Sequence, residues 1–260
     1  MNSAETRAPA RLGIAGLAGR MGQAIAVLLP EQAGLVLSAG FGRQAGTSAG
    51  VAVHDQLAAF MAEADVVIDF TLPEATPALA AAAATHQVPI VVGTTGLDAA
   101  QQAALVRASA HTAVFQARNF SLGVALLAAL TERAASVLPV DFDIEITETH
   151  HRGKVDAPSG TALLLGEAAA CGRGISLDAA EERGRDGADC QRAVGAIGFT
   201  ALRGGTVAGE HTVLYLGPDE RIELTHRATN RAIFARGALA AARWLVGRPP
   251  GRYGMDDLVG

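Results

Sequence analysis

The sequence predicts an α/β protein in two parts: a doubly wound parallel sheet, and an α+β domain with a mixed sheet. In the first half, short runs rich in valine and isoleucine alternate with helical patterns rich in alanine and leucine. This alternation is typical of a parallel sheet that helices cover on both faces. After residue 138, runs that alternate apolar and polar residues indicate strands with one face in solvent.

The first half supplies its strands and helices in turn. Each expected strand is a short apolar run, at residues 12–15, 35–41, 66–70, 88–92 and 113–117. The helical patterns lie at residues 21–29, 76–86, 98–110 and 121–138. We therefore expect one doubly wound domain over residues 11–121.

The second half mixes strands with a single strong helical pattern. A strand is expected at residues 142–149, followed by a helix at 159–170 that Ser159 caps. The charged stretch 172–187 indicates a solvated connection, and antiparallel strands are expected at residues 194–202, 212–216 and 221–225. A helix at 231–246 is expected to pack back onto the first domain. Residues 122–231 then form the second domain, and residues 232–260 complete the first.

Composition excludes several classes of protein. The 260 residues carry a net charge of -5 and no basic run that could neutralise a row of phosphates, so we expect no nucleic-acid partner. No apolar run is long enough to span a membrane. The leading residues, up to Ala10, lack the order of a signal peptide and are expected to form a disordered tail. Cys171 and Cys190 form neither a zinc motif nor a disulfide framework, which fits a reducing cytoplasm.

One lysine stands apart in this composition. Of the 21 basic residues all but Lys154 are arginine. A chain that uses arginine for ordinary surface charge keeps a lysine where it needs a compact ammonium that titrates or rotates. The alternative is that Lys154 is a chance survivor of a drift toward arginine.

A glycine motif lies at the first strand-to-helix turn. Residues 16–22 follow the pattern GxxGxxG directly after the first apolar run. Glycines there allow a tight turn and let the backbone approach a pyrophosphate, which the helix N-terminus attracts. We therefore expect a Rossmann-like dinucleotide site, although a tight turn without a ligand would need the same glycines. Its candidate residues are Gly16, Ala18, Gly19, Arg20, Met21 and Gly22.

Further strand ends are expected to meet the same cofactor. The second strand ends at Arg43 without an Asp or Glu to bind the ribose hydroxyls, so we expect NADP to be favoured and NAD to be usable as well. Arg43 could also be a solvated loop charge. Candidates at the next two strand ends are Phe70, Thr71, Gly93, Thr94 and Thr95. Small residues with hydroxyls suit close approach to the nicotinamide ribose, although each segment could be only a turn with a capping threonine.

The densest chemistry of the chain lies at residues 148–161, between a strand and a helix. The N–H groups of Gly160 and Thr161 can hold a carboxylate at the helix start, and His151 and Lys154 add donors beside it. His150 or His151 could be a general acid, because imidazole titrates near neutral pH. A structural role for either histidine is the alternative. We expect no metal, since consecutive histidines at a strand end point to opposite sides.

These motifs resemble those of the 4-hydroxy-tetrahydrodipicolinate reductase family, also called dihydrodipicolinate reductases. The most specific motif is ETHHRGKVDAPSGTA at residues 148–162. The similarity covers nearly the whole chain in order. Its other motifs are the glycine loop at 16–22, IDFT at 68–71, GTTG at 93–96, NFS at 119–121, GEHT at 209–212 and THRATNR at 225–231.

The resemblance implies an NAD(P)H-dependent reductase of 4-hydroxy-tetrahydrodipicolinate, a small cyclic imine dicarboxylate, in lysine and diaminopimelate biosynthesis. It implies that His150 donates the proton that accompanies hydride transfer and that Lys154 assists. His151, Lys154, Gly160 and Thr161 would hold the substrate carboxylates. It also adds Arg118, Asn119 and Phe120 to the cofactor site and implies a homotetramer that pairs its second-domain sheets.

The chain departs from the family pattern only near the cofactor. The acidic residue that some members place after the second strand is absent, which puts the affinity for NADH in question. Arg118 stands where a small residue or proline is usual, and Leu72 where an arginine is often found.

Two other functions are compatible with the fold. Another two-domain dehydrogenase, of aspartate type, would leave the segment from Lys154 to Thr161 without a clear role. A non-catalytic dinucleotide sensor would have no physical need for both His150 and Lys154.

Overall fold

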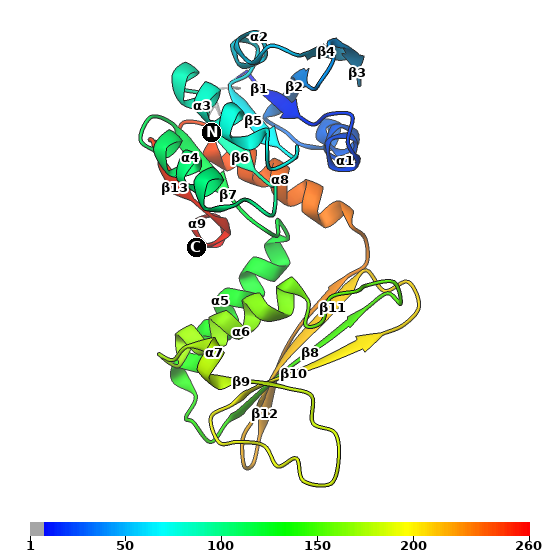
Figure 1. Cartoon of the computed structure of the whole chain (residues 1–260), viewed down its shortest axis with the longest axis vertical. Helices are drawn as coiled ribbons and strands as arrows, with labels where there is room; N and C mark the ends of the chain where they lie inside the picture. The colour runs from blue at the N-terminus through cyan, green and yellow to red at the C-terminus, as the bar shows by residue number, and fades with distance from the viewer. Residues whose placement is uncertain (1–7) are drawn as a thin grey trace, which may run out of the picture. The chain divides into compact units, whose positions relative to one another are not determined.

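A computed structural model describes residues 8–260 and divides the chain into two compact units. One unit comprises the chain up to Ser121 together with Ala232–Gly260, and the other comprises Leu122–Arg231. Each unit has its own sheet and its own core (Figure 1). Most of the N-terminal segment for which we expect disorder, residues 1–7, lies outside the described residues. Ala10, also placed in that tail, already belongs to the first strand.

The first unit is built on an eight-stranded sheet with the order β13-β7-β6-β5-β1-β2-β4-β3. All neighbouring pairs are parallel except β3 and β4. The strands are β1 (Ala10–Ala15), β2 (Leu35–Phe41), β3 (Gly46–Ser48), β4 (Val51–His54), β5 (Val66–Asp69), β6 (Ile90–Val92), β7 (Ala113–Gln116) and β13 (Gly251–Tyr253). The predicted doubly wound fold class is confirmed for this unit.

Helices cover both faces of this sheet. One core contains residues of α1 (Arg20–Leu28) and α8 (Ala232–Leu245), and the other contains residues of α2 (Leu57–Ala62), α3 (Thr76–His86) and α4 (Ala99–Ser109). Strand β5 contributes side chains to both cores: Val66 and Ile68 belong to the first core and Val67 to the second. Because both faces of such a strand are buried, its sequence is a continuous apolar run. The short helices η1 (Leu29–Glu31) and α9 (Met255–Val259) complete the unit.

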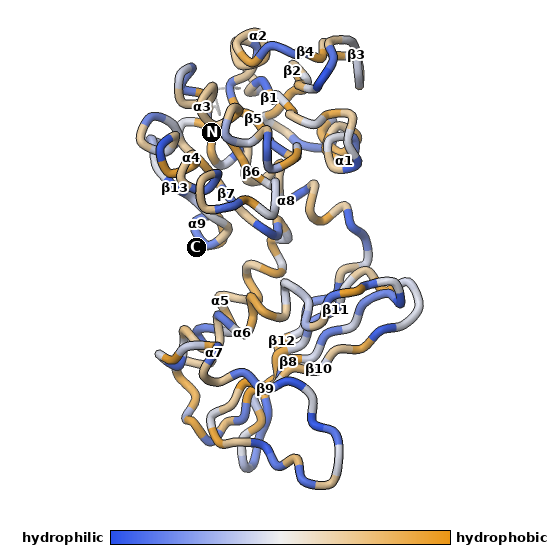
Figure 2. The backbone as a smooth tube through the Cα atoms, in the orientation of Figure 1, coloured by the Kyte–Doolittle hydropathy of each residue, from blue (hydrophilic) through white to orange (hydrophobic). Residues whose placement is uncertain are grey.

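The second unit has a five-stranded sheet with the order β12-β11-β8-β10-β9. Helices α5 (Leu122–Val137) and α6 (Gly160–Gly172) cover one of its faces, and Figure 2 shows both as largely hydrophobic. The predicted alternation is confirmed, since Ile144 and Ile146 are fully buried whereas Asp143 and Glu145 point to the other face. The strands are β8 (Asp143–His150), β9 (Glu181–Arg183), β10 (Ile197–Arg203), β11 (Gly209–Leu216) and β12 (Arg221–Ala228).

One expectation for this unit is wrong, and another is incomplete. Strand β10 runs parallel to β8 and β9, not antiparallel, because the chain crosses over through α6 before it returns to the sheet. The expected solvated connection at residues 172–187 contains a short helix, α7 (Leu177–Ala180), and the edge strand β9. Strand β9 reads Glu-Glu-Arg, so no apolar alternation indicates it.

Candidate active site

The residues predicted to bind the cofactor gather at one edge of the first sheet. They follow the carboxyl ends of β1, β2, β5, β6 and β7, which run parallel in neighbouring positions. From β1 the chain goes to β2 on one side and later to β5 on the other. The glycine loop after β1 therefore lies at the switch point where doubly wound sheets bind their ligands.

The glycine loop folds so closely on itself that side chains would not fit at Gly16 and Gly22. Gly16 has a φ of +81°, and a Cβ there would lie 2.7 Å from the carbonyl oxygen of Phe70. A Cβ at Gly22 would lie 2.4 Å from the carbonyl oxygen of Gly16. The N–H of Gly19 donates to that same oxygen at 2.9 Å. Because Gly19 has no side chain to cap α1, the first N–H groups of the helix can bind a phosphate.

The loop after β5 is organised by a carboxylate that sequence analysis missed. Asp69 is fully buried and accepts hydrogen bonds from the hydroxyls of Thr71 at 2.6 Å and Thr76 at 2.7 Å. The hydroxyl of Thr71 is thus used within the protein, but it caps no helix, since the N-cap of α3 is Ala75. The ring of Phe70 packs against Gly93, where a Cβ would lie 2.2 Å from the ring. The ring of Phe120 meets that of Phe70 edge-on at 5.6 Å.

The remaining cofactor candidates differ in exposure. Thr94 is buried and donates from its hydroxyl to the carbonyl of Thr71 at 3.3 Å. The side-chain oxygen of Asn119 accepts from the N–H of Ser121 at 2.8 Å. Exposed positions are occupied by Ala18, Gly19, Arg20, Arg43, Thr95 and Arg118, whereas Met21 is partly buried.

In the second unit, a buried ion pair holds His150 at the end of β8. The Nδ1 of His150 lies 2.5 Å from a carboxylate oxygen of Glu148, two residues earlier on the same face of the strand. Glu148 is 1% exposed and also accepts from both Nη atoms of Arg203 at 2.7 Å and from the N–H of Ser159 at 3.1 Å. Burial alone would raise the pKa of Glu148, but the hydrogen bonds from Arg203 and His150 outweigh it and lower the pKa. Glu148 is therefore an anion that fixes the proton of His150 on Nδ1 and leaves Nε2 for chemistry.

A second histidine packs against the first. His211 lies opposite Glu148 on β11, and its ring meets that of His150 edge-on, with centroids 5.1 Å apart. Its Nε2 lies 3.0 Å from the hydroxyl of Ser159. Burial, reinforced by the charge of His150, lowers the pKa of His211 to about 4. At neutral pH His211 is thus uncharged.

A glycine keeps the reactive side of His150 open. A Cβ at Gly209 would lie 3.0 Å from the Nε2 of His150, in a backbone conformation with φ of +155°. A side chain at this position would crowd the nitrogen that Glu148 leaves free. The GEHT motif, which contains both Gly209 and His211, therefore shapes the surroundings of His150 from the neighbouring strand.

The loop after β8 carries the other predicted substrate residues. The Nζ of Lys154 pairs with both carboxylate oxygens of Asp156, at 2.9 and 2.8 Å. His151 lines a hollow of about 790 Å³, in which Arg152 and Arg231 are the charged residues. The Nη2 of Arg231 lies 3.4 Å from the Nε2 of His151. A hollow of this size with cationic and no anionic lining residues suits a small anion.

The start of α6 lies next to Glu148 and His150. Ser159 caps the helix by accepting from the N–H of Ala162 at 3.1 Å, while its own N–H donates to Glu148. Gly160 is exposed, and a Cβ there would meet nothing within 4 Å. The helix start at Gly160 is therefore exposed, while Ser159 ties it to the residues around His150.

Three residues of this cluster besides Arg231 had no predicted role, namely Glu148, Arg203 and His211, whereas the predicted cap Ser159 is confirmed and also binds Glu148. Glu148 could have been found, because residues two apart on an alternating strand share a face. Arg203 gave no local signal. It reaches Glu148 because β10 pairs with β8 in a register that sets Arg203 opposite His150.

Neither a metal site nor a membrane span is found among residues 8–260. In that range no group of three or more His, Cys, Asp or Glu side chains could hold a metal ion. Over the same residues, each helix is too short or too polar to cross a membrane. Cys171 and Cys190 are free and exposed.

The chain was compared with known protein families and sequences. Family models described as dihydrodipicolinate reductase, N-terminus and C-terminus, match residues 10–120 and 123–259. A 4-hydroxy-tetrahydrodipicolinate reductase of Rhodopseudomonas palustris (strain BisA53) is 51% identical over 263 residues, which covers 96% of each chain. The protein of that name from Bradyrhizobium diazoefficiens is 49% identical and matches over 96% of this chain and 97% of its own.

Solved structures share the fold at lower identity. A dipicolinate-bound dihydrodipicolinate reductase from Paenisporosarcina sp. TG-14 has a TM-score of 0.79 and 23% identity, over 96% of this chain and 99% of its own. A DAP dehydrogenase of C. glutamicum has a TM-score of 0.57 and 14% identity, over 98% and 96% of the two chains. The fold alone is thus shared with other dehydrogenases, but the family models and the relatives at about half identity are specific. The chain belongs to the dihydrodipicolinate reductase family.

Proposed function

We propose that the chain is an NAD(P)H-dependent oxidoreductase that reduces 4-hydroxy-tetrahydrodipicolinate to tetrahydrodipicolinate in lysine and diaminopimelate biosynthesis. The observation that carries this proposal is the buried pair of Glu148 and His150 beside an open helix start and a cationic hollow. The name shared by its relatives supports the reaction, and the dipicolinate in the Paenisporosarcina structure supports a small dicarboxylate as substrate.

The proton is assigned to His150. The dinucleotide, when bound, would supply the hydride, His150 donates the accompanying proton from Nε2, and the 4-hydroxyl group of the substrate leaves as water. Glu148 stabilises the imidazolium before transfer and keeps Nδ1 protonated afterwards, so the ring delivers its proton from one defined atom. Arg203 and the N–H of Ser159 hold Glu148 in place, which makes it a positioning residue.

The substrate carboxylates are assigned to two neighbouring places. The N–H groups of Gly160 and Thr161 bind one at the start of α6, and His151 binds the other with Arg231 as a further donor. When substrate binds, the ammonium group of Lys154 leaves Asp156 for a substrate carboxylate. It then stabilises the negative charge of that carboxylate next to His150. This set is rich in donors, as a dianionic substrate requires.

The dinucleotide is assigned to the edge of the first sheet. The loop Gly16–Gly22 and the start of α1 bind the pyrophosphate, since the glycines leave room for it and the helix attracts it. Arg43 would face the 2′-phosphate, which would make NADP the favoured cofactor while NAD remains usable. The nicotinamide end is assigned to Phe70, Thr71, Gly93, Thr94, Thr95, Arg118, Asn119 and Phe120.

The assembly is proposed to be a homotetramer that acts in the cytoplasm. In the second unit α5 and α6 pack on one face of the sheet, whereas the other face presents Thr147, Thr212 and Thr225 (Figure 1). This second face is the one expected to pair with a partner sheet. Light scattering after size-exclusion chromatography would give the mass of four chains, and a monomeric mass would contradict the tetramer.

The decisive experiment follows the oxidation of NADPH, then of NADH, with substrate made in the cuvette by the preceding synthase. His150→Ala should lower turnover by about 10²- to 10⁴-fold without weakening cofactor binding, because it removes only the proton donor. His111→Ala, at an exposed histidine of the first unit, is the matched control. Tight cofactor binding without oxidation by the unmodified protein would instead support the sensor.

A further inference from the structure

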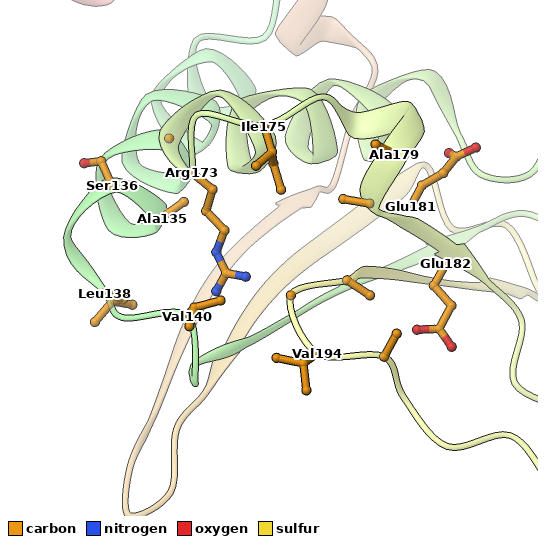
Figure 3. A pocket seen from close by; sticks show the side chains of 15 residues that line it. Ala135, Ser136, Leu138, Val140, Arg173, Ile175, Ala179, Glu181, Glu182 and Val194 are labelled. Atoms are coloured by element: carbon orange, nitrogen blue, oxygen red, sulfur yellow. The ribbon is translucent and has the colours of Figure 1, made fainter.

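A second hollow of the second unit has no residue in common with the hollow at His151. It measures about 650 Å³ and lies between the C-terminal ends of α5 and α6, the segment α7-β9, and residues 193–196 ahead of β10 (Figure 3). Most of its wall is aliphatic. The larger apolar side chains are Leu138, Val140, Ile175 and Val194, and five alanines fill the spaces between them.

The guanidinium of Arg173 enters this hollow with unused donors (Figure 3). Its Nη2 donates to the carbonyl of Phe142, but Nε and Nη1 are shielded from solvent and find no acceptor among residues 8–260. Burial lowers the pKa of Arg173, and the positive charge of Arg192 lowers it further. A shielded cation of this kind is stabilised by any anion that reaches it.

A carboxylate of opposite character lines the same hollow. Glu182, on β9, accepts at Oε1 from the Nε of Arg185 at 3.0 Å. Its Oε2 is shielded from solvent and receives no hydrogen bond from the described part of the chain. Figure 3 shows the guanidinium of Arg173 and the carboxylate of Glu182 entering the hollow from different elements, with apolar side chains between them.

We propose that this hollow binds a short aliphatic ω-amino acid, a molecule with a carboxylate at one end and an ammonium group at the other. The carboxylate accepts from Nε and Nη1 of Arg173, and the ammonium donates to Oε2 of Glu182. The methylene chain lies along the wall of Ala179, Val194 and their neighbours. A simple carboxylate would satisfy only Arg173 and a simple amine only Glu182, whereas this ligand satisfies both.

The test compares three probes on the full chain by isothermal titration calorimetry: 6-aminohexanoate, hexanoate and hexylamine. We expect 6-aminohexanoate to bind at least about tenfold more tightly than either analogue. Arg173→Met should weaken the binding of 6-aminohexanoate and hexanoate by about tenfold and leave that of hexylamine unchanged. Glu182→Gln should weaken the binding of 6-aminohexanoate and hexylamine by about tenfold and leave that of hexanoate unchanged. These two variants are matched in charge, because each removes one; Glu182→Gln also keeps the size of the side chain, and Arg173→Met keeps an unbranched stem without the guanidinium.

A third variant guards against misfolding of the first two. Ala179→Phe keeps both charged groups, occupies the hollow from an exposed position of α7, and should abolish binding of all three probes. The proposal is overturned if 6-aminohexanoate does not bind, if it binds no better than hexanoate, or if Ala179→Phe binds it as well as the unmodified chain.

Discussion

The two candidate sites depend on different physical features. In the first unit the cofactor loop depends on missing side chains, since Gly16 and Gly22 bring backbone atoms so close together that a Cβ would overlap them. In the second unit the site depends on buried charge, since Glu148 is 1% exposed and binds both Arg203 and His150. The first site should therefore be sensitive to added volume and tolerant of lost charge. The second should be sensitive above all to lost charge.

The largest effect is expected from added volume in the first unit. In Gly22→Ala the new methyl group would lie 2.4 Å from the carbonyl oxygen of Gly16 and 2.6 Å from the Cα of Leu17, and neither backbone atom can move aside easily. We expect a loss of about 2–4 kcal/mol in the free energy of unfolding and weaker NADPH binding. Urea unfolding and fluorescence titration would measure the two effects.

The matched control is Gly46→Ala, in strand β3 of the same unit. A Cβ at Gly46 would meet nothing within 4 Å, so this variant should unfold like the unmodified chain. Equal stability of the two variants would show that the glycine loop relaxes, and the contrast between the two sites would then fail for the first unit.

The same contrast explains what the sequence could predict. Strands such as β5 are buried on both faces and so give apolar runs, and the loop at residues 148–161 concentrates its histidines and lysine in one segment. The direction of β10 and the partner of Glu148 depend on a crossover and a strand register. Arg203 is 55 residues from Glu148 along the chain, and no local pattern indicates that they pair. Glycine sites are local in sequence, whereas buried charge networks form only when strands pair.

The second effect is a pH dependence of stability set by His211. Its pKa is lowered from 6.5 to about 4, so between these pH values the unfolded chain binds a proton that the folded chain does not. The free energy of unfolding therefore decreases as the pH falls from 6.5 toward 4. His211→Gln should remove up to about 3 kcal/mol of this decrease. Urea unfolding across the window, with His111→Gln as an exposed control, would measure it, and identical slopes for all three proteins would contradict the assignment.

The third effect is on turnover and comes from charge alone. Glu148→Gln keeps the shape of the side chain but removes the negative charge that stabilises protonated His150. We expect kcat/KM at neutral pH to fall by about 10- to 30-fold, and the shape of its pH profile to change.

Two comparisons separate this role from a structural one. Glu210→Gln, at a carboxylate that is 42% exposed and paired with Arg227, should leave the profile in place. A Glu148→Gln enzyme that is slower at every pH by the same factor would show that Glu148 only supports the fold around His150.

The smallest effect is expected from charge in the first unit. Arg43 is exposed at the end of β2, so its attraction for a 2′-phosphate is screened by water and salt. Arg43→Ala should weaken NADPH by about tenfold, less at high ionic strength, and leave NADH unchanged. Arg118→Ala, an exposed arginine proposed to lie at the nicotinamide end, is the matched control and should affect both cofactors alike. If Arg43→Ala left both affinities unchanged, Arg43 would be an ordinary solvated charge. NADPH and NADH differ only in the 2′-phosphate. If Arg43→Ala weakened the binding of both equally, Arg43 would act on a part that they share, and charge would contribute to the affinity of a site that we attribute to glycines.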